Sequence, residues 1–282
     1  MSFISKLGII FAKKWIGGVT ISDAISESKR LNSHGEKVII NFLGEDIKDK
    51  KIVSASAATY LNILKKMSKS GVAGSIAVKP TQLGLSINYA TFLSNYKNIV
   101  KYADKLGIFV WMDMEDYQTV DSSIKAYISV IKANKNAGIC IQSKLKRSLS
   151  DIKNIRRHSG IVRLVKGAYP LRKGITYMHK PEIDRNFLVC MDYLFNSPGK
   201  FMIATHDYSI ILRALSMERK LGKKAMFGML KGIRPSLANK LASEKEDINI
   251  YVPFGEEWLN YSLRRLKELE HSMLIIRSIF SN

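Results

Sequence analysis

Short apolar runs recur along the chain, and each is followed by a longer stretch whose apolar residues repeat every three or four positions. Short runs between turn residues indicate buried strands, whereas the longer spacing indicates amphipathic helices. The strands are predicted over residues 38–43, 75–78, 108–112, 138–141, 161–165, 201–204, 225–229 and 248–252. The helices between and after them are predicted over residues 54–69, 87–106, 122–133, 149–157, 181–195, 208–220 and 235–242, with a last helix through Arg264 and Arg265.

Eight strand–helix units in series predict a parallel sheet with right-handed crossovers. We therefore expect an α/β fold, a closed (β/α)8 barrel of the TIM type. Residues 1–35 carry two helical patterns and no clear strand, so the predicted domains are an N-terminal helical segment, 1–35, and a barrel, 36–282. A doubly wound open sheet is the alternative, but it usually has a Gly-x-Gly turn after its first strand. No two glycines of this chain have that spacing.

The composition is that of a globular protein, with 282 residues of which 46% are hydrophobic and 24% are charged. No apolar run reaches the roughly 20 residues of a membrane span. Residues 3–15 are predicted to form an amphipathic helix of the mature protein. Cys140 and Cys190 lie far apart and form no CxxC motif, which argues against a disulfide framework or a cysteine zinc site and suits a reducing cytosol. No other metal-ligand spacing is present.

The net charge is unusually positive, since 45 Lys and Arg residues against 24 Asp and Glu residues give +21. A charge of this size suits a nucleic acid, an anionic membrane surface or a lysine-rich composition. The lysines are spread over the whole chain rather than gathered in one tract, so no nucleic-acid partner is expected. The expected location is the cytoplasm, and peripheral contact with the inner face of the cell membrane stays open.

In a (β/α)8 barrel the C-terminal ends of the strands meet on one face, where active sites form. Polar and charged residues lie at the ends of several predicted strands of this chain. They are Lys79, Thr81, Asp113, Glu115, Asp116, Gln142, Arg163, Lys166, Thr205, His206, Asp207 and Tyr251. One such residue would be an ordinary rim group, but a series of them at one face indicates a lined pocket.

Two adjacent arginines in the last predicted helix suggest what this pocket binds. Arg264 and Arg265 follow Tyr261 in the helix and Tyr251 in the preceding strand. A guanidinium can bond both oxygens of a carboxylate at once, so the pair is suited to hold a carboxylate substrate. Judged on the helix alone, a solvated basic face is the alternative.

Four motifs carry a resemblance to a known family. They are Arg163-Leu-Val-Lys-Gly-Ala-Tyr169, Ala204-Thr-His206, Phe227-Gly-Met-Leu-Lys-Gly-Ile-Arg234, and Tyr251-Val-Pro-Phe-Gly with Tyr261-x-x-Arg264-Arg265. Together with Lys79-Pro-Thr-Gln-Leu-Gly84 and Asp113-Met-Glu, they resemble the proline dehydrogenase family, in the same order and over roughly residues 38–268. The resemblance implies an FAD-dependent (β/α)8 barrel that oxidises L-proline to 1-pyrroline-5-carboxylate and passes the electrons to a membrane quinone.

The resemblance also implies which residues would form the proline site. The substrate-binding residues that it implies are Lys79, Leu230, Tyr251, Tyr261, Arg264 and Arg265. The catalytic residues that it implies are Asp113, Arg163 and Tyr251. In this arrangement the two arginines and Lys79 would hold the carboxylate, the two tyrosines would pack on the proline ring, and Leu230 would form an apolar wall.

A second set of residues would hold the cofactor. The FAD-binding residues that the resemblance implies are Met114, Gln142, Arg163, Lys166, Gly167, Ala168, Tyr169, Thr205, His206 and Glu268. Gln142 would bond the isoalloxazine, and the Arg163 cation would lie near flavin N5, where it stabilises the reduced, electron-rich ring. Glu268 would reach the adenosine ribose.

The chain departs from the family pattern at Ser143-Lys144, Gly228, Lys231 and Leu269, where an aromatic residue, Gln, Tyr and Asn are commoner. The resemblance places these positions around the periphery of the cofactor. Two alternatives stay open at this point. One is a related flavin barrel on another substrate, such as a methylenetetrahydrofolate reductase-like enzyme, and the other is a basic barrel without enzymatic activity.

Overall fold

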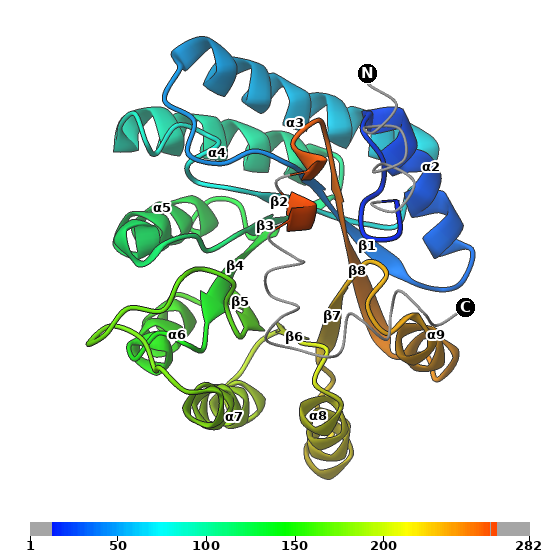
Figure 1. Cartoon of the computed structure of the whole chain (residues 1–282), viewed down its shortest axis with the longest axis vertical. Coiled ribbons are helices and arrows are strands. Elements are labelled where there is room, and N and C mark those ends of the chain that lie inside the picture. The colour runs from blue at the N-terminus through cyan, green and yellow to red at the C-terminus, as the bar shows by residue number, and fades with distance from the viewer. Residues whose placement is uncertain (1–12, 260, 264–282) are drawn as a thin grey trace.

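The computed structural model describes residues 13–259 and 261–263. Within these ranges eight parallel strands form a closed barrel in the order β1 to β8, each strand pairing with the next and β8 pairing with β1 (Figure 1). The strands are β1 Lys37–Phe42, β2 Gly74–Val78, β3 Phe109–Met112, β4 Ala137–Gln142, β5 Ile161–Val165, β6 Phe201–Ala204, β7 Met226–Leu230 and β8 Asp247–Phe254. The predicted (β/α)8 barrel is confirmed, and the open sheet is excluded because β1 and β8 are joined.

Helices surround the barrel in Figure 1. They are α2 Ile21–Asn32, α3 Lys50–Ser70, α4 Tyr89–Lys105, α5 Val120–Ile131, α6 Ser148–Arg157, α7 Lys180–Asn196, α8 Tyr208–Leu221 and α9 Pro235–Ser243, with the 3-10 turn η1 Tyr117–Thr119. Asp49, Asn88 and Asp207 cap the N-termini of α3, α4 and α8 by accepting backbone N–H bonds. Gly71 and Gly222 end α3 and α8 in the left-handed conformation that favours glycine.

The helix before the barrel, α2, has a defined N-terminus. Thr20 is its N-cap, and Thr20 and Asp23 form a reciprocal capping box. The helix packs against β1 and β8 on the outside of the barrel (Figure 1). Of the helix predicted over residues 3–15, residues 3–12 lie outside the described ranges, and residues 13–15 form a turn.

The interior of the barrel is filled by a compact set of side chains. Ile39, Ala77, Trp111 and Met202 form a buried cluster there. Gly138 leaves room for the indole, because a Cβ at this position would lie 2.4 Å from Cζ3 of Trp111. The interior is therefore a packed core, and a ligand can reach the side chains inside the barrel only at one of its ends.

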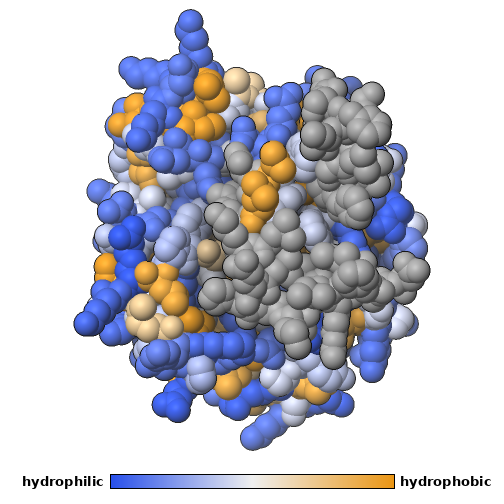
Figure 2. Space-filling view, in the orientation of Figure 1, coloured by the Kyte–Doolittle hydropathy of each residue, from blue (hydrophilic) through white to orange (hydrophobic). Residues whose placement is uncertain are grey.

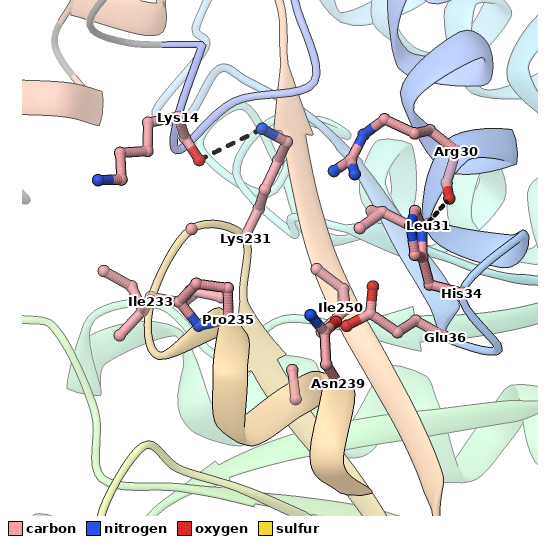
Figure 3. Close-up of a pocket in the computed structure, with 13 residues that line it drawn as sticks. Lys14, Arg30, Leu31, His34, Glu36, Lys231, Ile233, Pro235, Asn239 and Ile250 are labelled. Carbon is pink, nitrogen blue, oxygen red and sulfur yellow. Dashed lines mark hydrogen bonds between the residues drawn. The ribbon is translucent and has the colours of Figure 1, made fainter. Parts of the chain in front are cut away.

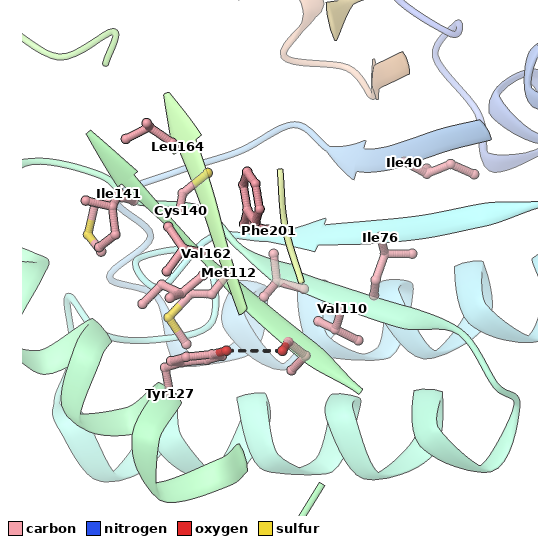
Figure 4. Packing of buried hydrophobic residues seen from close by; sticks show 14 of the residues in the cluster. Ile40, Ile76, Val110, Met112, Tyr127, Cys140, Ile141, Val162, Leu164 and Phe201 are labelled. Atoms are coloured by element: carbon pink, nitrogen blue, oxygen red, sulfur yellow. Dashed lines mark hydrogen bonds between the residues drawn. The ribbon is translucent and has the colours of Figure 1, made fainter. Parts of the chain in front are cut away.

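A larger core lies between the strands and the surrounding helices, and Figure 4 shows part of it. The fully buried Tyr127 of α5 carries its only polar group into this layer. Its hydroxyl accepts a 2.7 Å bond from Ile161 N and lies 3.2 Å from the carbonyl oxygens of both Ala137 and Ile161. One side chain thus ties α5 to the starts of β4 and β5 (Figure 4).

We expect Tyr127→Phe to lower the free energy of unfolding by about 1–3 kcal/mol, because the Ile161 amide would lose its buried acceptor. Urea unfolding followed by circular dichroism measures this change. Tyr208→Phe is the matched control, since Tyr208 is 44% exposed and should change stability little. Equal effects of the two substitutions would contradict the assignment.

Candidate active site

Three strands bring charged and polar groups together at the C-terminal end of the barrel. Asp113 follows β3, Arg163 lies on β5 and Tyr251 lies on β8. Tyr251 Oη donates a 2.7 Å bond to Asp113 Oδ2, and Arg163 Nη2 donates to Asp113 Oδ1. The Asp113 side chain is only 10% exposed, so the carboxylate and its two donors form a buried triad.

Several contacts hold Arg163 in place. Its Nε donates to Cys140 Sγ at 2.7 Å, and its guanidinium carbon lies 5.3 Å from the Trp111 ring and 5.5 Å from the Tyr251 ring. Burial alone would lower the pKa of Arg163, but Cys140, Asp113 and Tyr251 outweigh it and hold the pKa above its usual value. The site therefore contains a permanent cation within two aromatic faces.

Tyr251 and Cys140, two of the residues that contact Arg163, keep their protons at neutral pH. Burial raises the pKa of Tyr251 well above its usual range, and the Asp113 carboxylate raises it further. Burial also raises the pKa of the Cys140 thiol to about 11. At neutral pH Tyr251 is thus a neutral donor, and Cys140 is a thiol rather than a nucleophilic thiolate.

Lys79, directly after β2, lies among carboxylates at the same C-terminal end of the barrel, which we call its mouth. Its Nζ is 3.8 Å from Glu45 Oε2, and its side chain is 15% exposed. Burial raises the pKa of Glu115, although the nearby Lys79 charge and the bonds from Thr81 oppose the shift. Thr81 donates its N–H and its hydroxyl to this carboxylate at 2.8 and 2.6 Å. Lys79, the second cation of the site, is therefore close to two acidic groups, Glu45 and Glu115, which help to fix its position.

The ends of β4 and β5 approach each other very closely. Gln142 is buried, and its Nε2 donates a 2.7 Å bond to the Glu115 carbonyl. Gly167 has a φ of 109°, and a Cβ there would lie 2.6 Å from Gln142 Oε1 and 2.9 Å from Lys144 Cδ. Only glycine fits at this position, because a side chain would collide with both neighbours.

Tyr169 extends this surface across the mouth of the barrel. Its hydroxyl donates a 3.1 Å bond to Glu45 Oε2 on the loop after β1, and its carbonyl accepts a bond from the buried Lys144 ammonium. A small hollow next to it is lined by Glu115, Gln142 and Lys144 among others. Glu45 was missed from the sequence, although it follows the first predicted strand as the other site residues follow theirs.

The residues of this mouth fit a flavin, judged by the groups left without partners. Gln142 Oε1 and Arg163 Nη1 are both buried, and neither has a hydrogen-bond partner in the described part of the chain. Buried polar atoms are rarely left unpaired, so each points to a missing donor or acceptor. An isoalloxazine offers both kinds of group along its polar edge, and Gly167 lets a planar ring approach the backbone.

Lys166 takes part in an ion-pair network at the outer rim. Its Nζ lies 2.5 Å from Asp184 Oδ1 and 2.9 Å from Asp207 Oδ2. Thr205, directly after β6, is buried and accepts a 3.1 Å bond from Asp207 N. Ala168 is exposed on the loop after Lys166, and Met114 is buried after β3.

His206 has a structural contact that fixes its tautomer. Its Nε2 lies 2.8 Å from Leu230 N and accepts this bond, so the ring proton is on Nδ1. Leu230 in turn packs against Trp15 and Ile233 rather than within the Asp113 triad. Tyr261 is buried in another small cluster, with Ile16, Leu43 and Trp258. The predicted residues Arg264, Arg265 and Glu268 lie outside the described residues.

The departures from the family pattern fall at different depths. Lys144 is buried in the mouth, as described above, and Gly228 faces the barrel interior, where a Cβ would lie 2.9 Å from Met202 Sδ. Lys231 lies elsewhere: its Nζ is 3.3 Å from Glu27 and binds the carbonyls of Lys13 and Lys14. Leu269 lies outside the described ranges.

A closed (β/α)8 barrel with a charged triad at the C-terminal face is the arrangement in which barrel enzymes carry their active sites. The family model described as "Proline dehydrogenase" matches residues 24–272. The chain therefore belongs to the proline dehydrogenase family. Members of this family are flavin-dependent enzymes that oxidise proline, so the basic barrel without enzymatic activity is excluded.

Curated relatives agree with this assignment. The chain is 30% identical over 260 residues to "Proline dehydrogenase 1" of Bacillus subtilis subsp. natto, covering 91% of this chain and 86% of that one. It is 27% identical over 280 residues to "Proline dehydrogenase 2" of Bacillus subtilis strain 168, covering 94% and 92%. It is also 27% identical to "Proline dehydrogenase" of Deinococcus radiodurans, covering 91% and 86%.

Solved structures with the same fold are much longer proteins. Proline utilization A of Bdellovibrio bacteriovorus, inactivated by N-propargylglycine, superposes with a TM-score of 0.87 at 21% identity. The match covers 99% of this chain but only 34% of that one. Proline utilization A of Bradyrhizobium japonicum matches with a TM-score of 0.80 at 21% identity, over 95% of this chain and 32% of that one. At this identity the likeness shows the fold alone.

The Lys166–Asp207 pair makes stability depend on pH. Burial would raise the pKa of Asp207, but the bonds from Lys166 and Ser209 outweigh burial and hold the pKa well below the usual 3.8. A carboxyl group with a lowered folded pKa stabilises the fold fully above about pH 5, and this contribution declines as the pH falls through 3.8.

We expect Asp207→Asn to lower the free energy of unfolding at pH 7 by up to about 1 kcal/mol, because the pair is partly exposed. The difference from the unmodified protein should shrink between pH 5 and pH 2. Urea unfolding at several pH values measures it. Asp104→Asn on the exposed side of α4 is the control, and a pH-independent difference for Asp207→Asn would contradict the expectation.

Proposed function

We propose that this chain oxidises L-proline to 1-pyrroline-5-carboxylate by hydride transfer to FAD bound at the mouth of the barrel, and that a quinone accepts the electrons. The observation that supports it most is the buried triad of Asp113, Arg163 and Tyr251 beside two unpaired polar atoms, Gln142 Oε1 and Arg163 Nη1. Family membership supports the reaction, and this arrangement supports the proposal that it takes place at the mouth of the barrel.

The substrate would be held through its two charged ends. Lys79, with Arg264 and Arg265, would bind the carboxylate of proline. Asp113 would face the proline nitrogen, which must offer a lone pair when the hydride leaves the neighbouring carbon. The Tyr251 hydroxyl and the Arg163 guanidinium orient the Asp113 carboxylate by hydrogen bonds to its two oxygens, so its direction is fixed before the substrate arrives.

The ring of proline would be bounded by apolar surfaces. Tyr251 and Tyr261 would pack on it, and Leu230 would close one side. The bond from Leu230 N to His206 Nε2 fixes the backbone at the end of β7, which sets where this side chain begins. These surfaces would exclude water from the reacting carbon and strengthen the electrostatic interactions within the site.

FAD, when bound, supplies the hydride acceptor. The residues proposed to hold it are Met114, Gln142, Arg163, Lys166, Gly167, Ala168, Tyr169, Thr205, His206 and Glu268. The unpaired Gln142 Oε1 would accept a hydrogen bond from the ring, and the buried Arg163 cation would favour its electron-rich reduced form. Lys166 would offer a cation to the phosphates at the rim, in exchange for part of its pairing with Asp184 and Asp207.

A membrane quinone as acceptor requires the protein to reach a bilayer. No helix in the described ranges is long and apolar enough to cross a membrane. On the face shown in Figure 2, hydrophobic residues occur in small groups among hydrophilic ones. A net charge of +21 supports peripheral docking on an anionic bilayer, and residues 3–15 would be the contact segment.

The reaction is tested by an anaerobic titration of the purified, FAD-loaded protein with L-proline. We expect the absorbance of the oxidised flavin to bleach, and Arg264→Ala or Arg265→Ala to abolish bleaching at the same proline concentration. Bound flavin that does not respond to proline would contradict the proposed substrate. Protein that binds no flavin when FAD is supplied would contradict the proposed cofactor site.

Lys79→Met should lower kcat/KM for proline roughly 10- to 150-fold, because a hydrogen bond to a charged group contributes about 1.5–3 kcal/mol. The loss should appear mainly in KM, since Lys79 would contact the carboxylate in ground and transition states alike. Steady-state kinetics with an artificial acceptor measures it. Lys101→Met, an exposed lysine of α4, is the control and should leave both parameters unchanged.

Membrane docking is tested by flotation with liposomes that contain anionic phospholipid. We expect binding at low ionic strength that is lost as the salt concentration rises, because exposed charges are screened within about 10 Å at 0.1 M salt. Liposomes of neutral lipid are the control. Flotation with neither composition would remove the membrane proposal without affecting the proposed reaction.

A further inference from the structure

A second hollow lies on the outside of the barrel, away from the Asp113 triad. It has a volume of about 270 Å³ and lies beside β8, between α2 and α9 (Figure 3). Both helices pack against β8. The lining residues are Lys14, Arg30, Leu31, His34, Glu36, Leu230, Lys231, Gly232, Ile233, Pro235, Ala238, Asn239 and Ile250.

Glu36 is the unusual member of this lining. It is only 4% exposed, and its carboxylate forms no hydrogen bond or ion pair among the described residues, although the charges of His34 and Arg30 lie near enough to oppose the effect of burial on its pKa. Its backbone is fully used, since its N–H donates to Leu31 O and its carbonyl accepts from Asn32 Nδ2. A buried carboxylate without a partner is costly, and burial accordingly raises the pKa of Glu36.

Positive charge gathers around the same cavity. Lys14, Arg30 and Lys231 line it, and Figure 3 shows Arg30 and Lys231 above Glu36 in this view. Arg30 and Lys231 share one carboxylate, Glu27, at 2.8 and 3.3 Å. The Lys14 side chain points away from the hollow, and its carbonyl faces Lys231 (Figure 3). Two cations, Arg30 and Lys231, therefore share one acid, and Glu36 is not part of that ion pair.

The walls between these charges are largely apolar. Leu31, Ile233, Ala238 and Ile250 are each at most 6% exposed and line the hollow. The volume is slightly below the range typical of drug-sized ligands, so the occupant would be a small molecule. A purely cationic ligand would leave the excess of positive charge unmatched, and a purely anionic one would leave Glu36 unpaired.

We propose that this cavity is a binding site for an aliphatic α-amino acid in its zwitterionic form. The ammonium group pairs with Glu36, the carboxylate faces Arg30, whose Nε and Nη2 alone bind Glu27, and the aliphatic side chain packs against Leu31, Ile233 and Ile250. The site is separate from the substrate site, with Leu230 as the one residue that belongs to this lining and to the proposed proline wall.

Isothermal titration calorimetry of the FAD-loaded, full-length protein with L-leucine tests the proposal. We expect saturable binding, which Glu36→Gln weakens about tenfold or more because the ammonium loses its charged partner. 3-Methylbutylamine lacks the carboxylate and 4-methylpentanoate lacks the ammonium, so both should bind about tenfold more weakly. Glu244→Gln is the matched control, since this carboxylate is 49% exposed, and should leave the affinity unchanged.

Two further variants locate the ligand. Ala238→Met fills the cavity without removing a charge and should abolish L-leucine binding, while thermal unfolding reports that the fold is intact. Lys79→Met affects the proposed proline site and should leave L-leucine affinity unchanged. Absence of binding to the unmodified protein, or binding that survives both Glu36→Gln and Ala238→Met, would overturn the proposal. Binding that Lys79→Met removes would assign L-leucine to the proline site and overturn it too.

Discussion

The buried ion pair between Asp113 and Arg163 is the interaction on which the mouth of the barrel depends. Removing two charges from water is costly, and their mutual attraction offsets this cost only when the geometry is good and the remaining polar atoms are bonded. Here Tyr251 binds the second carboxylate oxygen, Cys140 accepts from Arg163 Nε, and two aromatic rings face the guanidinium. These contacts come from β3, β4 and β8, so the surroundings of the pair are complete only when the barrel has closed.

The fold was predictable because burial on both faces makes every strand of a parallel barrel an apolar run. The predicted strand 161–165 agrees with β5, and the predicted 248–252 lies within the longer β8. The differences are mostly at the ends, where hydrogen bonding to a neighbouring strand, rather than hydrophobicity, decides which residue is last. The turn η1 and the long loop before α7 gave no periodic signal, and the start of α2 was set by a threonine cap that lies outside the apolar pattern.

The repeat of apolar strands also made part of the site predictable. The position of Asp113 and Gln142 at strand ends, and of Arg163 within a strand, follows from the repeat, and the barrel brings them together. Contacts made by particular side chains do not follow from it. Nothing in the sequence indicates that Cys140 supports Arg163, because this contact depends on the register between β4 and β5. Nor does it indicate that Tyr169 reaches Glu45, because this contact joins two loops that are far apart in sequence. The packing of Leu230 on Trp15 likewise depends on where the segment before the barrel returns.

A pair of this kind is a poor means of stabilising a protein, since well-packed apolar residues at the same positions are often as good or better. The layer directly below it, Ile39, Ala77, Trp111 and Met202, shows that this barrel packs such residues without difficulty. Two polar atoms at the mouth, Gln142 Oε1 and Arg163 Nη1, remain unbonded within the described chain. Selection for stability alone would have removed both features. Their presence together at the strand ends is explained when a ligand completes the hydrogen bonding and uses the fixed charges, which is the requirement of flavin-dependent proline oxidation.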